Sequence, residues 1–197
     1  MANEGGLTLM NNKTKGFSLI EVLVSLVILV IGLIGIFNLH LVAKRGSFES
    51  FQQTLASYYA IDIINRMKLN RSQLASYAGT YAGTLPEPSK SCDVALMVGG
   101  GSGGIICSNV ETRAWDLYGW EQSMNGAGET KGTRSIGGLD TPTACIQVSG
   151  SGDVLVVMTW RGIRAVSDGA SNADAFVKSC GTANKRRRAY SINTVII

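Results

Sequence analysis

One acidic side chain is the first candidate for chemistry, because it lies inside an apolar run. Residues 17–43 read FSLIEVLVSLVILVIGLIGIFNLHLVA, and Glu21 is the fifth residue of this segment. A charged group inside a membrane-spanning segment costs on the order of 3 kcal/mol, so such acids usually have a partner and a function. Ser18 and Glu21 also fit the S-x-x-E capping box, in which the acid would sit in the first helical turn at little cost. The sequence favours a functional role for Glu21 and leaves capping as the alternative.

The four cysteines are the second candidate for chemistry: Cys92, Cys107, Cys145 and Cys180. An even number of cysteines behind an export-type N-terminus favours disulfides. Of the possible pairings, the sequential one closes the shortest loops, and we expect Cys92 to pair with Cys107 and Cys145 with Cys180. Zinc binding is the alternative, but the sequence has no C-x-x-C spacing.

Composition argues against catalysis and against a cofactor. The chain has one histidine, His40, which lies in the apolar run, and no dense cluster of His, Cys, Asp and Glu. Candidate nucleophiles therefore have no histidine base nearby, and a metal site is not indicated. We expect a protein that is not an enzyme and that binds no cofactor or metal.

Basic residues give a weak signal for a partner. The net charge is +4, which does not by itself indicate nucleic acid. The densest basic run is KRRR at residues 185–188, and its simplest interpretation is a solvated turn before an edge strand. Contact with an acidic partner or with DNA phosphates is the alternative. Because no aromatic-interleaved basic patch accompanies the run, nucleic acid is not an expected partner.

The element that must position Glu21 is a long N-terminal helix. Residues 17–43 exceed the roughly 20 apolar residues that span a bilayer. A cleaved secretory signal would be shorter and would end in an A-x-A-like site, and a plain anchor would leave Glu21 unexplained. Beyond the run, one apolar stripe continues at helical spacing, which predicts a helix to about Ser76 with one face on a globular head. The stripe consists of Phe48, Phe51, Leu55, Tyr59, Ile63 and Met67.

The rest of the chain predicts a small mixed domain. A short helix is expected within residues 108–124, with loops at 99–104 and 126–138. Strands are expected at 144–148, 154–160 and 190–197 because these segments alternate and are rich in β-branched residues. The predicted fold class is α+β, with an antiparallel sheet packed on the amphipathic part of the long helix.

Residues 15–28, KGFSLIEVLVSLVI, resemble the class III signal of type IV prepilins and type II secretion pseudopilins. In that family a prepilin peptidase cuts after the glycine, here Gly16, and the new N-terminal residue, here Phe17, is N-methylated. Basic residues precede the cut, as Lys13 and Lys15 do here, and a glutamate stands at the fifth mature position, as Glu21 does. The resemblance implies that Glu21 is an assembly residue, which pairs with the N-terminal amine of a neighbouring subunit.

The resemblance also implies an organisation and a set of partners. Residues 1–16 would be a cleaved leader, 17–43 the transmembrane and filament-core half of the first helix, 44–78 its amphipathic half, and 79–197 the head of a pilin fold. The expected location is the inner membrane, single-pass with a periplasmic head, and then the pilus at the cell surface. The implied partners are major and minor pilin subunits, prepilin peptidase, the inner-membrane assembly platform and membrane lipid.

A second, softer resemblance concerns the head. Residues 155–162, LVVMTWRG, together with Trp115, Trp120, Cys180 and the terminal strand, are similar to the type IV pilus modification protein PilV group of minor pilins. Major pilins typically carry a proline in the membrane half, and residues 17–43 have none. We therefore expect a minor pilin that acts in pilus assembly or initiation. A type II secretion pseudopilin and an adhesin or DNA-binding minor pilin are the alternatives.

Overall fold

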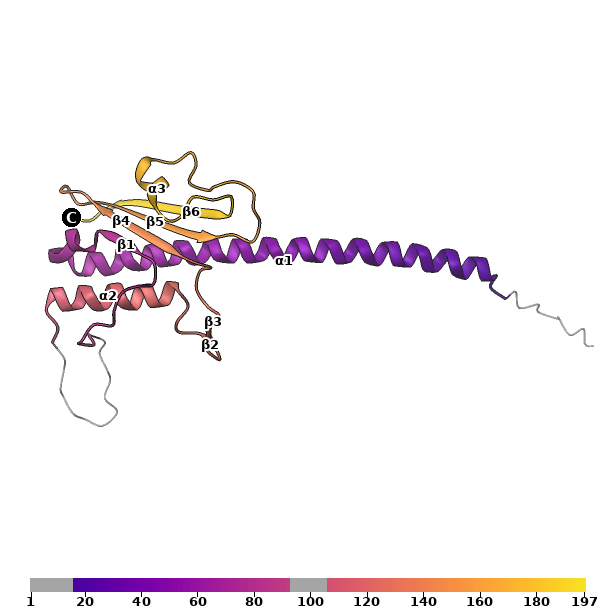
Figure 1. Cartoon of the computed structure of the whole chain (residues 1–197), viewed down its shortest axis with the longest axis horizontal. Helices are drawn as coiled ribbons and strands as arrows, with labels where there is room; N and C mark the ends of the chain where they lie inside the picture. Colours follow the sequence, from indigo (N-terminus) through magenta and orange to yellow (C-terminus); the bar gives the residue numbers. More distant parts are fainter. Residues whose placement is uncertain (1–15, 93–105) are drawn as a thin grey trace, which may run out of the picture. The chain divides into compact units, whose positions relative to one another are not determined.

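The computed structural model describes residues 16–92 and 106–197, so the predicted leader residues 1–15 and the predicted loop at 99–104 lie outside the described part. The chain divides into two compact units, Met1–Lys44 and Arg45–Ile197. The helices and strands carry the labels of Figure 1 throughout.

The described part of the first unit is mainly the N-terminal part of α1 (Leu19–Leu69), a helix of 51 residues. Residues 16–40 are all exposed, and most of them are large and apolar. Among the described residues, α1 is the helix whose length and composition suit it to cross a membrane. The predicted apolar helix is therefore present.

The second unit holds a four-stranded antiparallel sheet in the order β1-β4-β5-β6. Its strands are β1 (Gly79–Tyr81), β4 (Thr143–Val148), β5 (Asp153–Arg161) and β6 (Arg187–Val195). The three predicted strands are confirmed, although β6 begins and ends earlier than expected. The short strand β1 was not predicted; it pairs with β4 from Gly79↔Ile146 to Tyr81↔Ala144.

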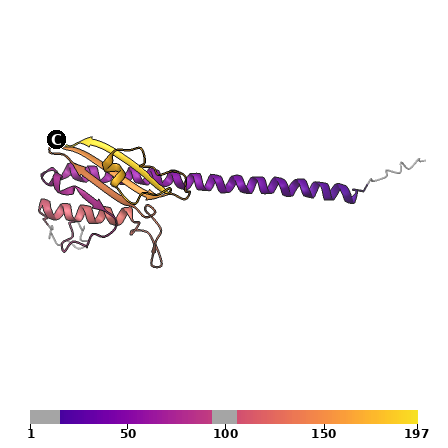
Figure 2. The same cartoon turned by 45° about the horizontal axis from the view of Figure 1, so that its top comes forward.

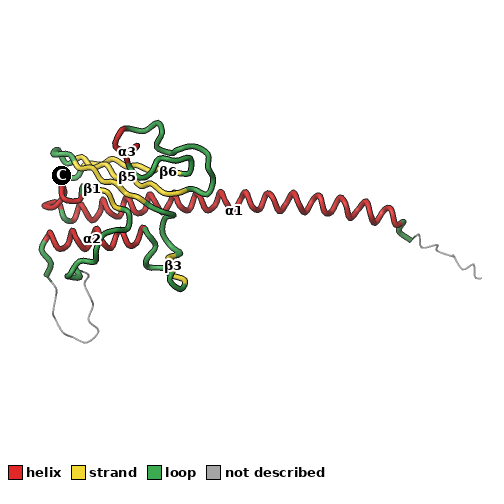
Figure 3. Tube along the Cα trace, in the orientation of Figure 1, coloured by secondary structure: helices red, strands yellow, loops and turns green. Residues whose placement is uncertain are grey.

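The remaining elements are short. They are α2 (Asn109–Met124), the hairpin of β2 (Thr130–Lys131) and β3 (Arg134–Ser135), and α3 (Ala175–Ser179). The prediction of a helix within 108–124 is confirmed. The prediction that 126–138 is only loop is wrong, because it contains the β2–β3 hairpin. Figure 3 shows that loops make up most of the connection between β5 and β6, with α3 within it.

The sheet of the head lies between two layers. The C-terminal part of α1 and α2 cover one face, and α3 with its flanking loops covers the other (Figures 1 and 2). The larger core joins Ile63 and Met67 of α1 to Trp120 of α2 and to β5. The smaller core surrounds Cys145 and Cys180. The predicted α+β fold, a long N-terminal helix packed on a small antiparallel sheet, is confirmed.

The apolar stripe of α1 was predicted correctly only at its C-terminal end. Tyr59, Ile63 and Met67 are buried, but Phe48 and Phe51 are exposed. Gln52, which lies off the stripe, is buried instead, with 3% of its surface exposed. Its side-chain amide donates to the carbonyl of Gly138 at 3.1 Å and accepts the N–H of Asp140 at 2.9 Å. Because both polar groups of the amide are satisfied, burial of this side chain is tolerated.

The end of α1 also differs from the prediction. The helix ends at Leu69 rather than near Ser76, and a 3-10 helix, η1 (Arg71–Tyr77), follows it. Asn70 separates the two with φ −124° and ψ 52°, outside the helical region. Its buried amide donates to the carbonyl oxygen of Asn109 at 2.7 Å. A polar contact with α2 therefore accompanies the end of the helix, before the predicted end near Ser76.

Buried polar groups also fix α2 in the head. Trp120 is fully buried, and its indole Nε1–H donates to the carbonyl of Tyr59 on α1 at 2.8 Å. Glu121 is also fully buried, and its carboxylate accepts the N–H groups of Gly83 and Leu85, each at 2.8 Å. These contacts tie α2 both to α1 and to the chain that follows β1.

Both disulfides have the sequential pairing that was expected. Cys92 bonds to Cys107 and Cys145 to Cys180, closing sequence separations of 15 and 35 residues. The second disulfide is buried in the smaller core and ties β4 to the end of α3. The described residues include no free cysteine.

We expect the Cys145–Cys180 disulfide to stabilise the head more than the Cys92–Cys107 disulfide. It closes the longer loop and lies in the core, so a Cys145→Ala/Cys180→Ala variant should lose about 4 kcal/mol of unfolding free energy, against about 3 kcal/mol for Cys92→Ala/Cys107→Ala. Denaturant unfolding of the full chain in detergent, followed by circular dichroism, measures both losses. A larger loss in the Cys92→Ala/Cys107→Ala variant would contradict this ranking.

Candidate functional site

The predicted cleavage position lies at the start of the described chain. Gly16 and Phe17 precede α1 and are exposed, Phe17 with 83% of its surface accessible. A Cβ added at Gly16 would meet no atom within 4 Å. The peptide bond between the two residues is thus open to a protease, and the fold does not itself require glycine here.

The first turn of α1 is capped by backbone rather than by a capping box. The carbonyl of Ser18 accepts the N–H of Glu21 at 3.0 Å and that of Val22 at 3.2 Å. The hydroxyl of Ser25 donates to the backbone carbonyl of Glu21. Within residues 16–92 and 106–197, the Glu21 carboxylate is exposed and makes no hydrogen bond or ion pair. The capping interpretation of the S-x-x-E pattern therefore has no contact in its favour here.

The same pattern forms a complete capping box elsewhere in this chain. At the start of α2, the Ser108 hydroxyl accepts the N–H of Glu111 at 3.3 Å, and the Glu111 carboxylate accepts the N–H of Ser108 at 2.7 Å. The Ser108 N–H, and then the Lys90 ammonium and the Ser108 hydroxyl, donate to the Glu111 carboxylate and lower its pKa. The contrast shows that Glu21 has the residue type and spacing of a cap without its geometry.

The Glu21 carboxylate is accordingly available to a cation from elsewhere. It lies in the first turn of α1, where the partial positive charge of the helix dipole favours an acid. Its neighbours along the chain include the exposed apolar residues Phe17, Ile20 and Val24. If lipid or other subunits cover these side chains, an ammonium group that reached the carboxylate would form a stronger pair than it would in water.

The segment that carries these residues matches a known family model. Residues 11–37 match the prokaryotic N-terminal methylation motif. This motif is the class III signal of type IV pilin-like and pseudopilin-type proteins, which prepilin peptidase processes. The match includes Gly16, Phe17 and Glu21 and ends inside the apolar run, before the head. Comparisons with curated proteins and with solved structures give no match for this chain.

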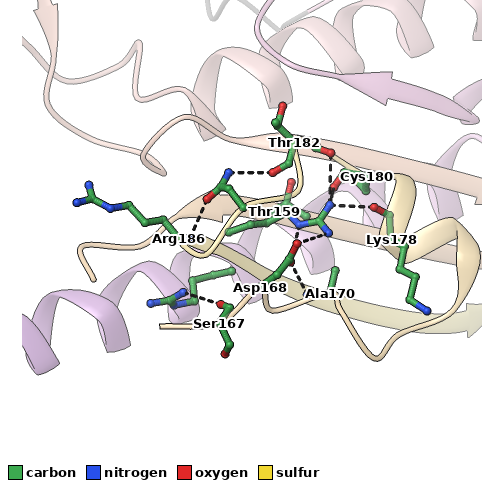
Figure 4. A network of polar contacts seen from close by, with 12 residues as sticks. Thr159, Ser167, Asp168, Ala170, Lys178, Cys180, Thr182 and Arg186 are labelled. Atoms are coloured by element: carbon green, nitrogen blue, oxygen red, sulfur yellow. Dashed lines mark hydrogen bonds and ion pairs between the residues drawn. The ribbon is translucent and has the colours of Figure 1, made fainter. Parts of the chain in front are cut away.

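The prediction that KRRR is a solvated turn is wrong for half of the run. Lys185 and Arg186 are exposed, but Arg187 has 4% of its surface accessible. Its guanidinium donates to the Asp168 carboxylate at 2.7 and 2.8 Å and to the carbonyls of Lys178 and Cys180 at 2.9 Å (Figure 4). Arg187 thereby holds the loop before α3 and the chain around Cys180 against β6.

Arg188 is also used within the head. It forms an ion pair with Glu49 of α1 at 3.5 Å, and it donates to the carbonyl of Arg164 at 2.9 Å. The sequence did not reveal these roles, because Asp168 and Glu49 are 19 and 139 residues away along the chain. In the part of the chain that the structure describes, no group of three or more His, Cys, Asp or Glu is placed to hold a metal ion.

The Arg187–Asp168 pair predicts a pH dependence of stability. The Arg187 guanidinium, and then the N–H of Ala170, lower the pKa of the Asp168 carboxyl. A carboxyl whose pKa is lowered on folding stabilises the fold above its unfolded pKa, about 3.9 for aspartate. That stabilisation is lost as the pH falls through the lower folded value.

An Asp168→Asn variant tests this pair. At neutral pH it should lose about 2 kcal/mol, because it removes hydrogen bonds to a charged group. The difference in melting temperature between wild type and variant should narrow as the pH falls below about 4, because the carboxyl is then protonated first in the unfolded chain and, at lower pH, in the folded protein. Thermal unfolding of both proteins across this range measures the difference. A difference that stays constant would contradict the role of the charge.

Proposed function

We propose that this protein is a minor type IV pilin, a structural subunit that acts in pilus assembly or initiation. The observation that carries the proposal is the methylation motif at residues 11–37, on a helix that continues into a disulfide-bonded α+β head. Both features are needed for the proposal. The motif alone, or an α+β head alone, would also fit other classes of protein.

Processing is the first step of the proposed function. Prepilin peptidase removes residues 1–16 and methylates the new N-terminus at Phe17. Support comes from the exposed Gly16–Phe17 bond and from the open space around Gly16. A residue without a side chain lets another backbone approach closely, as a protease active site requires.

Anchoring and assembly follow. Residues 17–43 hold the subunit in the inner membrane, with the head in the periplasm, and later lie in the filament core among other pilins. Such a segment needs lipid or other subunits to cover its exposed apolar surface. The two disulfides support a periplasmic head, because that compartment is oxidising.

Glu21 has the central role in assembly. Cleavage creates an amine on Phe17, and methylation retains its positive charge. In a filament core both an unpaired ammonium and an unpaired carboxylate would cost several kcal/mol, so pairing Glu21 of one subunit with the amine of its neighbour offsets both penalties. The exposed, unpartnered carboxylate of Glu21 in the described chain supports this role.

The minor-pilin assignment rests on two features of the sequence. Residues 17–43 contain no proline, and β5 with Trp160, together with Trp120 and Cys180, is similar to the PilV group. Burial of Trp120 and Cys180 in the two cores makes them part of the head's framework. We do not assign a DNA-binding role, because Arg187 and Arg188 already have partners within the head.

Sheared pili test the assignment. Mass spectrometry of pili from wild-type cells should detect this protein at a low ratio to the major subunit, and deletion of its gene should reduce the number of pili. Secretion of type II substrates should be unchanged. Absence from pili, together with a block in that secretion, would identify the protein as a pseudopilin instead.

A further inference from the structure

Four cations at one end of the head have no ion-pair partner among the described residues. They are Arg45, Arg164, Lys185 and Arg186, all exposed, and we call them the basic cluster. The acids at this end are already engaged. Arg188 pairs with Glu49 at 3.5 Å, Arg161 with Asp140 at 3.1 Å, and Arg187 with Asp168 at 2.7 Å. The cluster therefore presents an uncompensated positive charge.

Backbone contacts bring these cations together. The N–H of Gly162 donates to the carbonyl of Arg186 at 2.8 Å, and that of Val166 to the carbonyl of Lys185 at 3.0 Å. The segments 162–166 and 185–186 thus lie side by side. In Figure 4 the side chain of Arg186 extends away from the Asp168 network, so it remains free to meet a partner.

The cluster is attached to the start of the head's part of α1. The N–H of Ile163 donates to the Glu49 carboxylate at 2.8 Å, and Arg188 pairs with the same carboxylate. Arg45 precedes Glu49 by one helical turn, so both side chains lie on one face of α1. Residue 49 follows the apolar run 17–43 by six residues, a span of at most about 22 Å even when fully extended.

Two exposed apolar side chains accompany the free cations. Ile163 and Val166 flank Arg164 in the same segment, with 39% and 56% of their surfaces accessible. A combination of basic and exposed apolar side chains suits a membrane interface, where apolar groups enter the acyl boundary and cations meet anionic headgroups. A nucleic-acid backbone would use the cations but would leave Ile163 and Val166 without a role.

We propose that the basic cluster docks the head on anionic phospholipid headgroups, such as those of phosphatidylglycerol, on the membrane that residues 17–43 span. The inference rests on the membrane anchoring in the proposed function. Each Lys or Arg near a charged bilayer strengthens the contact roughly fivefold, so several weak contacts together would hold the head at the surface. The subunit would give up these contacts when it leaves the bilayer for a filament.

Hydrogen exchange of the full chain in lipid nanodiscs tests the proposal. We compare nanodiscs of phosphatidylcholine alone with nanodiscs that also contain phosphatidylglycerol. The test variant is Lys185→Gln/Arg186→Gln, which leaves the Arg187 and Arg188 pairs intact. The control variant is Lys68→Gln/Arg71→Gln, which removes the same charge where α1 ends and η1 begins, about 30 Å along α1 from Glu49.

The expected result is slower exchange at 161–166 and 184–188 when phosphatidylglycerol is present. The equilibrium constant for docking should fall roughly 30-fold in Lys185→Gln/Arg186→Gln. It should also fall at raised salt, and it should stay unchanged in the control variant. Equal exchange in both lipids would overturn the docking but not the anchor. Inorganic phosphate or a DNA oligonucleotide is also added to the chain in phosphatidylcholine nanodiscs. If either slowed exchange as much as phosphatidylglycerol does, that result would overturn the lipid docking in favour of the added anion. A chain that failed to enter nanodiscs would contradict both the anchor and the docking.

Discussion

A Gly16→Val variant is expected to accumulate as an uncleaved precursor. The branched side chain would keep the peptidase backbone from approaching the bond before Phe17, and a misplacement of about 1 Å at a reacting bond can cost on the order of a hundredfold in rate. Immunoblots of cells that express the variant should show the precursor-sized band and little of the mature form. No pili should then contain this subunit, because its N-terminal amine never forms.

A matched glycine separates processing from folding in this experiment. Gly32 lies within α1, and a Cβ there, as at Gly16, meets no atom within 4 Å. A Gly32→Val variant should be cut as efficiently as the wild type. If Gly16→Val gave a normal amount of mature-sized protein, the cleavage position would have to lie elsewhere.

A Glu21→Val variant should insert into the membrane normally but enter filaments poorly. Insertion should not suffer, because the change removes a carboxylate that costs on the order of 3 kcal/mol in the bilayer. Assembly should fall a hundredfold or more, because about 3–5 kcal/mol is lost when one partner of a buried ion pair is removed. The amount of variant in sheared pili, relative to that in membranes, measures the effect.

Two further variants separate pairing from helix capping. Glu21→Gln keeps a polar side chain of similar size but cannot neutralise an ammonium, so it should assemble nearly as poorly as Glu21→Val. Ser18→Ala removes the other half of the S-x-x-E pattern and should assemble normally, since the loss of a cap costs only about 1 kcal/mol. Equal defects in Ser18→Ala and Glu21→Val would favour capping, and normal assembly of Glu21→Val would exclude the pairing.

The sequence was most informative where a local pattern controls the structure. The apolar run, the three longer strands and the helix at 108–124 follow from periodicity and composition, which depend on neighbouring residues only. The motif around Gly16 and Glu21 is similarly local. The sequential disulfides were also predicted, because short loops close at lower entropic cost than long ones.

The features that were missed depend on partners far along the chain. Gln52 and Arg187 are polar residues that burial alone would penalise, and each is buried because distant groups satisfy its hydrogen bonds. Phe48 and Phe51 belong to a regular stripe, but the head's core begins only further along α1, near Leu55. No local pattern shows where a helix meets its core or which backbone groups a buried side chain will find.

The most direct test of the proposed pilin is mass analysis of the N-terminal peptide from the mature protein, isolated from membranes. Cleavage and methylation together predict a chain that begins at Phe17 with a singly methylated α-amine. A mature chain that begins at Met1, or at any residue other than Phe17, would contradict the account, as would an unmodified Phe17.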